Sequence, residues 1–129
     1  VSLNEELMLL EKYIYLQKMR FGDSLMLDNR CKSKPVCDIE IPPLTLQLLA
    51  ENAIKHNTVS STKPLTIQIE LTDDSILISN NLNEKVTKEA GENIGLQNIK
   101  NRFKLFTKKE VEIHKTRTKF VVVLPILKP

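Results

Sequence analysis

The stretch Leu46-Gln-Leu-Leu-Ala-Glu-Asn-Ala-Ile-Lys-His-Asn57 is an apolar segment whose polar side chains gather at one end. Its aliphatic residues recur at the spacing of an amphipathic helix, and Pro42 and Pro43 stand just before it. Proline is tolerated in the first turn of a helix because its missing N–H would have no partner there. The pattern therefore predicts a helix from residue 43 to about residue 57.

Three polar residues of this helix are predicted to share one face. Lys55 and His56 lie three and four positions after Asn52, which brings the three side chains together. An amide oxygen can bind a metal ion and an ammonium can neutralise a phosphate, so this face indicates a nucleotide site. On the residues alone other interpretations stay open. Asn52 could bond to nearby backbone, and the helix dipole favours cations at a C-terminal end in any protein.

The composition is that of an ordinary globular domain. With 129 residues, 41% of them hydrophobic and 27% charged, the chain suits a single core. The net charge of +3 is mild and its basic residues are scattered among acids, so no nucleic-acid partner is expected. No apolar run approaches the roughly 20 residues of a membrane span. Cys31 and Cys37 fit no zinc pattern, which predicts two thiols in a reducing compartment.

Apolar periodicity predicts two further helices. Ser2 and Glu5 form a capping box, and the positions behind them recur at helical spacing to about residue 20. Those positions are Leu3, Leu7, Leu10, Ile14 and Phe21. The other helix is expected from residue 94 to about residue 106. Its predicted inward stripe consists of Leu96, Ile99, Phe103 and Phe106.

Alternating or dense apolar runs predict the strands. Two short strands are expected at 25–27 and 36–39 around a polar turn, followed by hairpins at 65–71 with 75–79 and at 111–114 with 119–124. Asn80 and Asn81 are expected to end the second strand of the first hairpin. Residues 82–93 show no apolar period, which is typical of a mobile connection. The predicted fold class is α+β: a two-layer sandwich with three helices on one face of a mixed, mainly antiparallel sheet.

Two segments together resemble the LytS-like sensor histidine kinases. Residues 42–57 are similar to the N box of that family, and Gly91-Glu-Asn-Ile-Gly-Leu-Gln-Asn-Ile-Lys-Asn-Arg-Phe103 to its glycine box. Residues 3–21 resemble the segment that joins the phosphoacceptor helices to the ATP-binding domain. The resemblance implies a Bergerat fold of the GHKL ATPase superfamily. It also implies a division into a linking helix, residues 1–22, and an ATP-binding domain, residues 23–129.

The resemblance implies that ATP and Mg²⁺ bind between the N-box helix and the third helix. Asn52 would bind Mg²⁺ through its side-chain oxygen, which suits a hard cation. Lys55 would neutralise phosphate charge, and His56 and Asn57 would line the ribose and phosphate rim. The backbone N–H groups that would face the phosphates from the other side belong to Gly95 and Leu96.

On the adenine side the sequence departs from the family. Ser79-Asn-Asn-Leu-Asn83 stands in place of the Asp-x-Gly-x-Gly box and contains neither glycine. Asn80 occupies the position of the aspartate, where its amide oxygen would accept from the adenine amino group as a neutral, weaker acceptor. Asn93 replaces a common glycine, and Leu48 stands where relatives in the wider superfamily carry a polar or acidic residue. The change at Asn80 predicts weaker adenine binding. Asn93 would make close approach of the backbone to phosphate less easy, and Leu48 leaves no general base at its position.

The implied activity is transfer of the ATP γ-phosphoryl group to a histidine. Neither His56 nor His114 lies in the family's phosphoacceptor context, and the chain begins at Val1 within a helical pattern. We therefore expect the chain to be part of a longer protein and to contain no catalytic residue itself. The expected partners are the upstream phosphoacceptor helices, a response regulator and, in the full-length protein, a second copy. The domain is expected in the cytoplasm, in a protein anchored in the inner or plasma membrane.

Two alternatives remain at this point. The missing aspartate and glycines are also typical of a degenerate, non-catalytic signalling module of the same fold with weakened nucleotide binding. The glycines at the start of the third helix would alone be compatible with a small anion-binding α+β protein unrelated to kinases.

Overall fold

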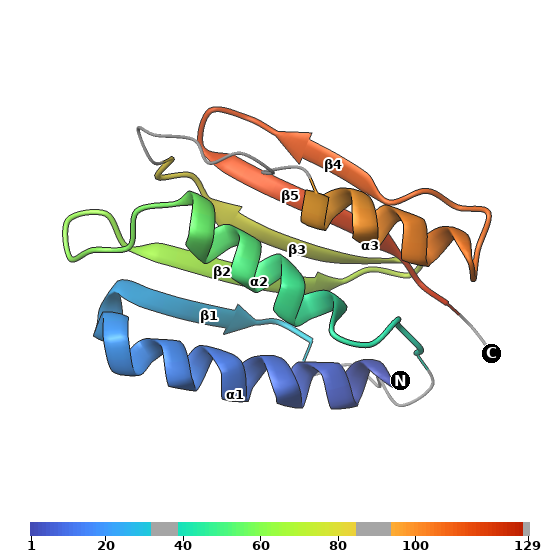
Figure 1. The fold of residues 1–129 in the computed structure, drawn as a ribbon, viewed down its shortest axis with the longest axis horizontal. Helices are drawn as coiled ribbons and strands as arrows, with labels where there is room; N and C mark the ends of the chain where they lie inside the picture. Colours follow the sequence, from blue (N-terminus) through green and yellow to red (C-terminus); the bar gives the residue numbers. More distant parts are fainter. Residues whose placement is uncertain (32–38, 85–93, 128–129) are drawn as a thin grey trace.

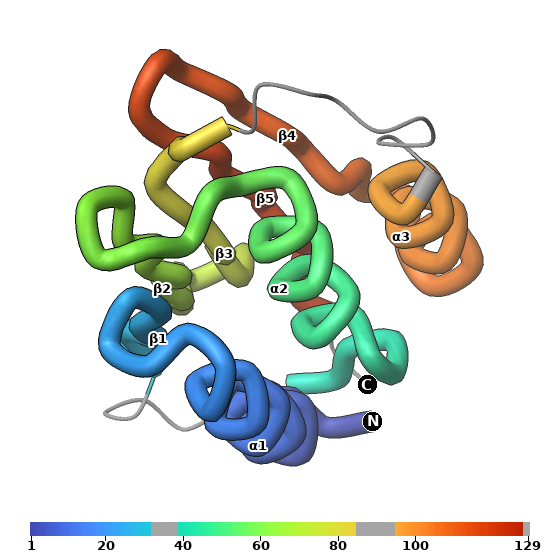
Figure 2. Tube along the Cα trace, turned by 60° about the vertical axis from the view of Figure 1, so that its left-hand side comes forward, coloured from blue at the N-terminus to red at the C-terminus, as the bar shows by residue number. Residues whose placement is uncertain are grey.

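Helices and strands separate into two layers in the computed structural model, which describes residues 1–31, 39–84 and 94–127 (Figure 1). In chain order the elements are α1 (Leu3–Phe21), the 3-10 helix η1 (Gly22–Ser24), β1 (Leu25–Asn29), α2 (Thr45–His56), β2 (Leu65–Leu71), β3 (Ser75–Asn81), α3 (Ile94–Lys104), β4 (Glu112–Lys115) and β5 (Lys119–Pro125). Figure 2 shows α1, α2 and α3 on the same side of the sheet. The predicted α+β class and its two layers are confirmed.

The sheet is mixed, with strand order β1-β2-β3-β5-β4. All neighbours are antiparallel except β1 and β2, which run parallel with Leu25 opposite Leu65. Parallel neighbours need a crossover of a dozen or more residues, and here the crossover contains α2. The strand predicted at 36–39 as a partner of β1 lies mostly outside the described residues. The parallel pairing with β2 was missed because apolar alternation identifies a strand but not its neighbour.

The core lies between the sheet and the helices. Along β2 the buried residues alternate with more exposed polar ones, and the buried set is Leu65, Ile67, Ile69 and Leu71. The predicted apolar face of α1 joins the same core through Leu3, Leu7, Leu10 and Ile14. Ser2 caps this helix as predicted, because its Oγ accepts from the Glu5 N–H at 3.2 Å. Residues 1–22 thus pack into the core of the remaining chain, and their linking role stays a prediction.

The prediction that Pro43 begins the second helix is wrong, because α2 begins at Thr45. Pro42 and Pro43 lie in the turn before the helix, where the Thr45 hydroxyl donates to the Pro42 carbonyl at 2.6 Å. Leu44 precedes the first helical residue and adopts a left-handed conformation with a φ of 65°. The helix therefore starts from a tight turn, and the side chain of its N-cap residue, Leu44, makes no capping hydrogen bond.

The inward stripe predicted for the third helix is correct for Ile99 and Phe103, which are buried, and wrong for Phe106, which is 63% exposed. The helix ends at Lys104. The backbone N–H groups of Phe106 and Thr107 then both donate to the Phe103 carbonyl at 3.0 Å, so the chain turns before Phe106 can reach the core.

Candidate functional site

Asn80 is part of β3, and this decides where its side chain lies. The strand predicted at 75–79 continues through Asn80 and Asn81, because these two residues pair with Phe120 and Lys119 of β5. Pairing within the sheet overrides the low strand preference of asparagine. Successive side chains of a strand point to opposite faces, so Asn80 shares the face of the buried residues Ile76 and Ile78. This face is the one that the helices cover.

A small cavity between α2 and the sheet brings Asn80 and Asn52 together. Its lining comes from α2, β2, β3 and β5 and consists of Leu49, Asn52, Ala53, Ile67, Ile78, Asn80, Phe120 and Val122. Its volume of about 10 Å³ is room for a single water molecule. The residues that the sequence predicted for the metal end and the adenine end of a nucleotide site therefore line one space.

The predicted polar face of α2 is present and partly accessible. The Asn52 side chain is half-buried and makes no hydrogen bond to another described residue. Lys55 is exposed and His56 half-buried in the last turn of the helix. Glu51 is exposed on another side of α2, where it accepts from Gln47 at 3.2 Å. Asn52 thus lines the cavity with an amide group that makes no hydrogen bond to the described residues.

The structure uses the Asn57 side chain to hold two segments together. Asn57 is 4% exposed. Its Nδ2 donates to the Ala53 carbonyl at 2.8 Å, and its Oδ1 accepts from the Asn83 N–H at 2.7 Å. These bonds join the end of α2 to the chain that follows β3. Sequence reasoning placed this side chain at the ribose and phosphate rim and did not anticipate the structural contact.

The sequence likewise did not predict that Asn81 and Asn83, at and just after the end of β3, form structural hydrogen bonds. Asn81 Oδ1 accepts from the Thr66 N–H at 2.7 Å, and Asn81 Nδ2 donates to the Pro64 carbonyl at 2.9 Å. Asn83 Nδ2 reaches the carbonyls of Lys63 and Pro64 at 3.2 and 2.8 Å. The available signal was the repetition of asparagine itself, since each amide carries both a donor and an acceptor.

The Asn80 amide is only half engaged. Its Nδ2 donates to the Asn81 carbonyl at 2.9 Å, while its Oδ1 makes no hydrogen bond to another described residue. Asn80 is 6% exposed, so an unengaged acceptor lies at the wall of the cavity. An amide oxygen in this position can accept from an N–H group of a ligand.

Gly95 and Leu96 lie in the first turn of α3, whose backbone N–H groups lack partners within a helix. A Cβ atom on Gly95 would meet nothing within 4 Å, so packing among the described residues does not require glycine there. α3 packs against α2, beside which it lies in Figure 2. Residues 91–93 of the glycine box, like most of the predicted 82–93 connection, lie outside the described residues.

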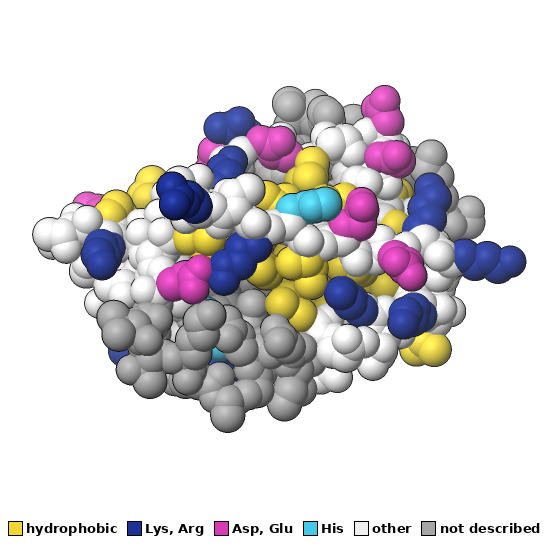
Figure 3. Space-filling model, turned by 90° about the horizontal axis from the view of Figure 1, so that it is seen from above, with side chains coloured by type: hydrophobic (Ala, Val, Ile, Leu, Met, Phe, Trp, Pro, Cys, Tyr) yellow, Lys and Arg dark blue, Asp and Glu magenta, His cyan; other side chains and the backbone are white. Residues whose placement is uncertain are grey.

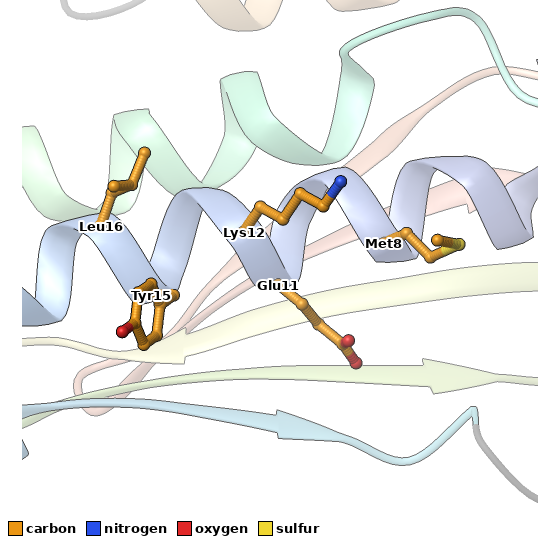
Figure 4. Close-up of a pocket in the computed structure, with 5 residues that line it drawn as sticks. All are labelled: Met8, Glu11, Lys12, Tyr15 and Leu16. Carbon is orange, nitrogen blue, oxygen red and sulfur yellow. The ribbon is translucent and has the colours of Figure 1, made fainter.

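Three further features of the described residues were compared with this cavity: a second hollow, clusters of metal-binding side chains and the distribution of charge. A larger hollow on the outside of α1 is lined by Met8, Glu11, Lys12, Tyr15 and Leu16 (Figure 4) and contains none of the predicted site residues. No cluster of three or more His, Cys, Asp or Glu residues suited to a metal occurs in residues 1–31, 39–84 and 94–127. Basic and acidic side chains are interspersed over the described part of the face in Figure 3. No helix of the described parts has the length and apolar character to cross a membrane.

Comparison with known proteins gives consistent relatives. No family model matches the chain. The chain is 40% identical over 80 residues to the sensor protein LytS of Oceanobacillus iheyensis, covering 60% of the chain and 14% of that protein. It is 28% identical over 130 residues to the sensor protein LytS of Streptococcus mutans, covering 88% of the chain and 22% of that protein. The chain thus spans less than a quarter of the length of either relative.

The fold also matches solved structures. The catalytic domain of the histidine kinase ThkA, in a nucleotide-free form, superimposes with a TM-score of 0.63 at 13% sequence identity. The match covers 99% of this chain and 96% of that domain. The chain therefore has the fold of that catalytic domain.

Proposed function

We propose that the chain, which is similar in sequence to the LytS sensor proteins and has the fold of a histidine kinase catalytic domain, is an ATP-binding catalytic domain that binds ATP with Mg²⁺ between α2 and the end of β3. The observation that carries this proposal is the meeting of Asn52 and Asn80 at one cavity. Each presents an amide group with bonding capacity that the described residues leave unused. The two walls can thus bind different ends of one ligand.

Asn80 would bind the adenine end. Its Oδ1 accepts from the adenine amino group, while its Nδ2 keeps its bond to the Asn81 carbonyl. An adenine ring is much larger than a space that holds one water molecule, so binding includes a separation of the cavity walls. A conformational cost of this kind lowers the apparent affinity.

Asn52 would bind Mg²⁺ at the phosphate end. Magnesium prefers oxygen ligands, keeps several waters and is commonly held by one or two protein groups together with substrate phosphates. A single amide oxygen without a nearby carboxylate cluster in the described residues fits that mode. Lys55 would neutralise phosphate charge, and His56 would lie at the rim.

The remaining predicted site residues would shape this end of the pocket. The first-turn N–H groups of Gly95 and Leu96 would face the phosphates, since unpaired donors and the helix dipole favour an anion. Asn57 would contribute at the rim by fixing the last turn of α2 against the Asn83 backbone.

The activity we propose is transfer of the γ-phosphoryl group to a histidine on phosphoacceptor helices elsewhere in the full-length protein. The residues named here would position ATP and neutralise its charge, which is the main requirement of phosphoryl transfer. A response regulator would receive the phosphoryl group from that histidine. We further propose that the full-length protein is a membrane-anchored homodimer, as an expectation from the family.

A degenerate module of the same fold is the second candidate. It is supported by the neutral acceptor at Asn80 and by the small volume of the cavity. The two candidates differ in whether nucleotide binds and whether a full-length version is phosphorylated.

Calorimetric titration with adenosine, ADP and ATP, each with Mg²⁺ and with EDTA, tests the proposal. Asn52→Ala should weaken ATP binding in Mg²⁺ by about tenfold or more and leave adenosine binding unchanged, because it removes a metal ligand. Asn80→Ala should weaken all three ligands by a similar factor, with or without metal. Glu51→Ala is the matched control, because Glu51 is an exposed neighbour of Asn52 on α2, and it should change the affinity for none of the three ligands.

The outcomes separate the two candidates. Absence of binding at millimolar ATP would reject the nucleotide site and favour the degenerate module. If Asn52→Ala lost adenosine and ATP affinity equally, the metal role of Asn52 would be wrong. Phosphorylation of a histidine in a full-length version would exclude the non-catalytic alternative.

A further inference from the structure

The start of α2 lacks a cap of its own. Leu44, the N-cap residue, has a side chain that cannot accept a hydrogen bond and a left-handed φ of 65°. Serine, threonine, aspartate or asparagine normally fills this position because its side-chain oxygen accepts from a backbone N–H of the first turn. The nearby Thr45 hydroxyl does not substitute, since it donates to the Pro42 carbonyl.

A carboxylate from another helix occupies this position in space. Glu6 of α1 is 1% exposed, and its Oε1 accepts from the Thr45 N–H at 2.8 Å. The backbone N–H groups of Leu44 and Leu46 also favour its charged form. The unpaired N–H groups and dipole of a helix start stabilise a negative charge, so Glu6 has the position and chemistry of an N-cap.

The arrangement is costly for a purely structural cap. Glu6 Oε2 has no hydrogen-bond partner among the described residues, and burial raises the pKa of this carboxyl above its ordinary value. A polar residue at position 44 would cap α2 without burying a carboxylate. The cap from α1 does what a local cap cannot do, which is to join two helices.

The first residues of α1 are attached to the approach to α2 as well. The Leu3 N–H donates to the Ile39 carbonyl at 2.8 Å, and the Ile41 N–H donates to the Val1 carbonyl at 2.9 Å. In Figure 1 the N-terminal end of α1 lies near the chain that leads into α2. Glu6 therefore completes a continuous connection from α1 through the turn to the first residue of α2.

We propose that the Glu6 side chain of α1 caps the start of α2 in place of the N-cap residue Leu44, and that through this bond Glu6 is a positioning residue for the nucleotide site. α2 is one helix from Thr45 to His56 and carries Asn52 on its cavity side. A displacement of α1 is transmitted through Glu6 to α2, and it changes where Asn52 stands relative to Asn80. This proposal rests on the proposed nucleotide site, whereas the capping bond itself does not.

Four variants test the proposal: Glu6→Ala, Glu6→Gln, Glu5→Ala and the double variant Glu6→Ala/Leu44→Asn. The measurements are the ATP affinity in Mg²⁺ and hydrogen–deuterium exchange of a peptide from the first turn of α2, with an α3 peptide as internal reference. Glu5→Ala is the matched control, because Glu5 lies in the same turn of α1 and is exposed. All measurements are made where circular dichroism shows the variants folded.

We expect Glu6→Ala to weaken ATP binding about tenfold, as loss of a supporting residue commonly does, and to accelerate exchange at the start of α2 alone. Glu6→Gln keeps an amide oxygen as acceptor and should stay within about twofold of the wild type. Leu44→Asn should restore affinity in the double variant, because asparagine tolerates the left-handed region and can accept from the first turn.

Equal affinity and exchange in Glu6→Ala and Glu5→Ala would overturn the proposal. So would a loss of affinity that Leu44→Asn does not reverse, since the loss would then come from the core. If Glu6→Ala does not fold, recovery of a folded, ATP-binding protein in the double variant supports the proposal, and failure of that recovery overturns it. If the wild type binds no nucleotide, the proposed function fails and the positioning role fails with it. Hydrogen–deuterium exchange then tests only the capping bond. Faster exchange at the start of α2 in Glu6→Ala, but not in Glu6→Gln, would support that bond.

Discussion

The two walls of the cavity use asparagine in opposite ways. On α2, the Asn52 side chain is half-buried and makes no hydrogen bond to another described residue. At the end of β3, Asn81 and Asn83 direct their amides to backbone groups at the start of β2 and just before it. Asn57 joins the end of α2 to the chain that follows β3. Asn80 lies between these cases, with one amide atom engaged. The hydrogen bonds of each side chain, rather than its residue type, therefore separate candidate ligand groups from residues that hold the scaffold.

The largest effect that tests this comparison is expected from Asn57→Ala. The substitution leaves the Asn83 N–H without its acceptor in a buried region, and an unsatisfied buried donor costs about 2–3 kcal/mol of unfolding free energy. Urea denaturation followed by circular dichroism measures the change. Asn101→Ala, an exposed residue of α3, is the control and should change stability by less than about 0.5 kcal/mol. Similar losses in both variants would show that Asn57 is not a structural clamp.

Asn80→Asp is expected to have the next largest effect, with opposite signs for stability and binding. The carboxylate cannot donate to the Asn81 carbonyl and is buried near it, so we expect a loss of about 1–2 kcal/mol of unfolding free energy. A charged acceptor forms stronger hydrogen bonds, so adenosine and ATP should both bind about threefold to tenfold more tightly. Urea denaturation and titration measure the two effects. A variant that loses stability without gaining affinity would place the adenine amine elsewhere.

How much could be predicted from sequence also differs between the walls. The α2 wall follows from helical periodicity, because the spacing of Asn52, Lys55 and His56 alone places them on one face. The β3 wall does not follow from local pattern. Asparagine favours turns, and only pairing with Phe120 and Lys119 of β5, some 40 residues later in the chain, draws Asn80 and Asn81 into a strand.

The errors at helix ends have a similar cause. The spacing that predicted an inward Phe106 continues past the residue where the helix stops, and periodicity does not report where backbone bonds change partners. Glu6 was considered only as one residue of the segment 3–21 that resembles the family. Nothing local marks an acidic residue in a first turn as the cap of a different helix, because that position favours acids in any helix.

Lys55→Ala tests the α2 wall at its exposed end and should have a smaller effect. Lys55 is exposed, and an exposed charge contributes little, so ATP affinity should fall by about threefold and adenosine affinity should stay unchanged. The difference should shrink as salt rises, because exposed charges are screened. Lys109→Ala, an exposed lysine after α3, is the control for general charge. Equal losses of ATP affinity in both variants would mean that the effect comes from the net charge of the protein and not from a contact of Lys55 with ATP.

The smallest expected effect is a change in how stability varies with pH, and it concerns the end of α2 that Glu6 holds. Burial raises the pKa of the Glu6 carboxyl, against opposing contributions from the Leu44, Thr45 and Leu46 backbone N–H groups and the Val1 ammonium. A carboxyl with a raised pKa in the folded state binds its proton more tightly than in the unfolded state. Its contribution to stability is therefore complete below its ordinary pKa of 4.5 and is lost as the pH rises through the raised value.

Glu6→Gln should remove that pH dependence because glutamine does not ionise and its amide oxygen can still accept from Thr45. The free energy of unfolding of Glu6→Gln relative to the wild type should therefore increase as the pH rises from 4.5 toward neutrality, measured by urea denaturation at a series of pH values. Glu5→Gln, in the same turn of α1, should leave the pH profile unchanged. Parallel profiles for the wild type and Glu6→Gln would mean that the Glu6 carboxyl has the same proton affinity in both states. Burial of the Glu6 carboxyl would then cost no more free energy than a solvent-exposed cap. That result would remove the argument from cost for a role of Glu6 beyond a structural contact.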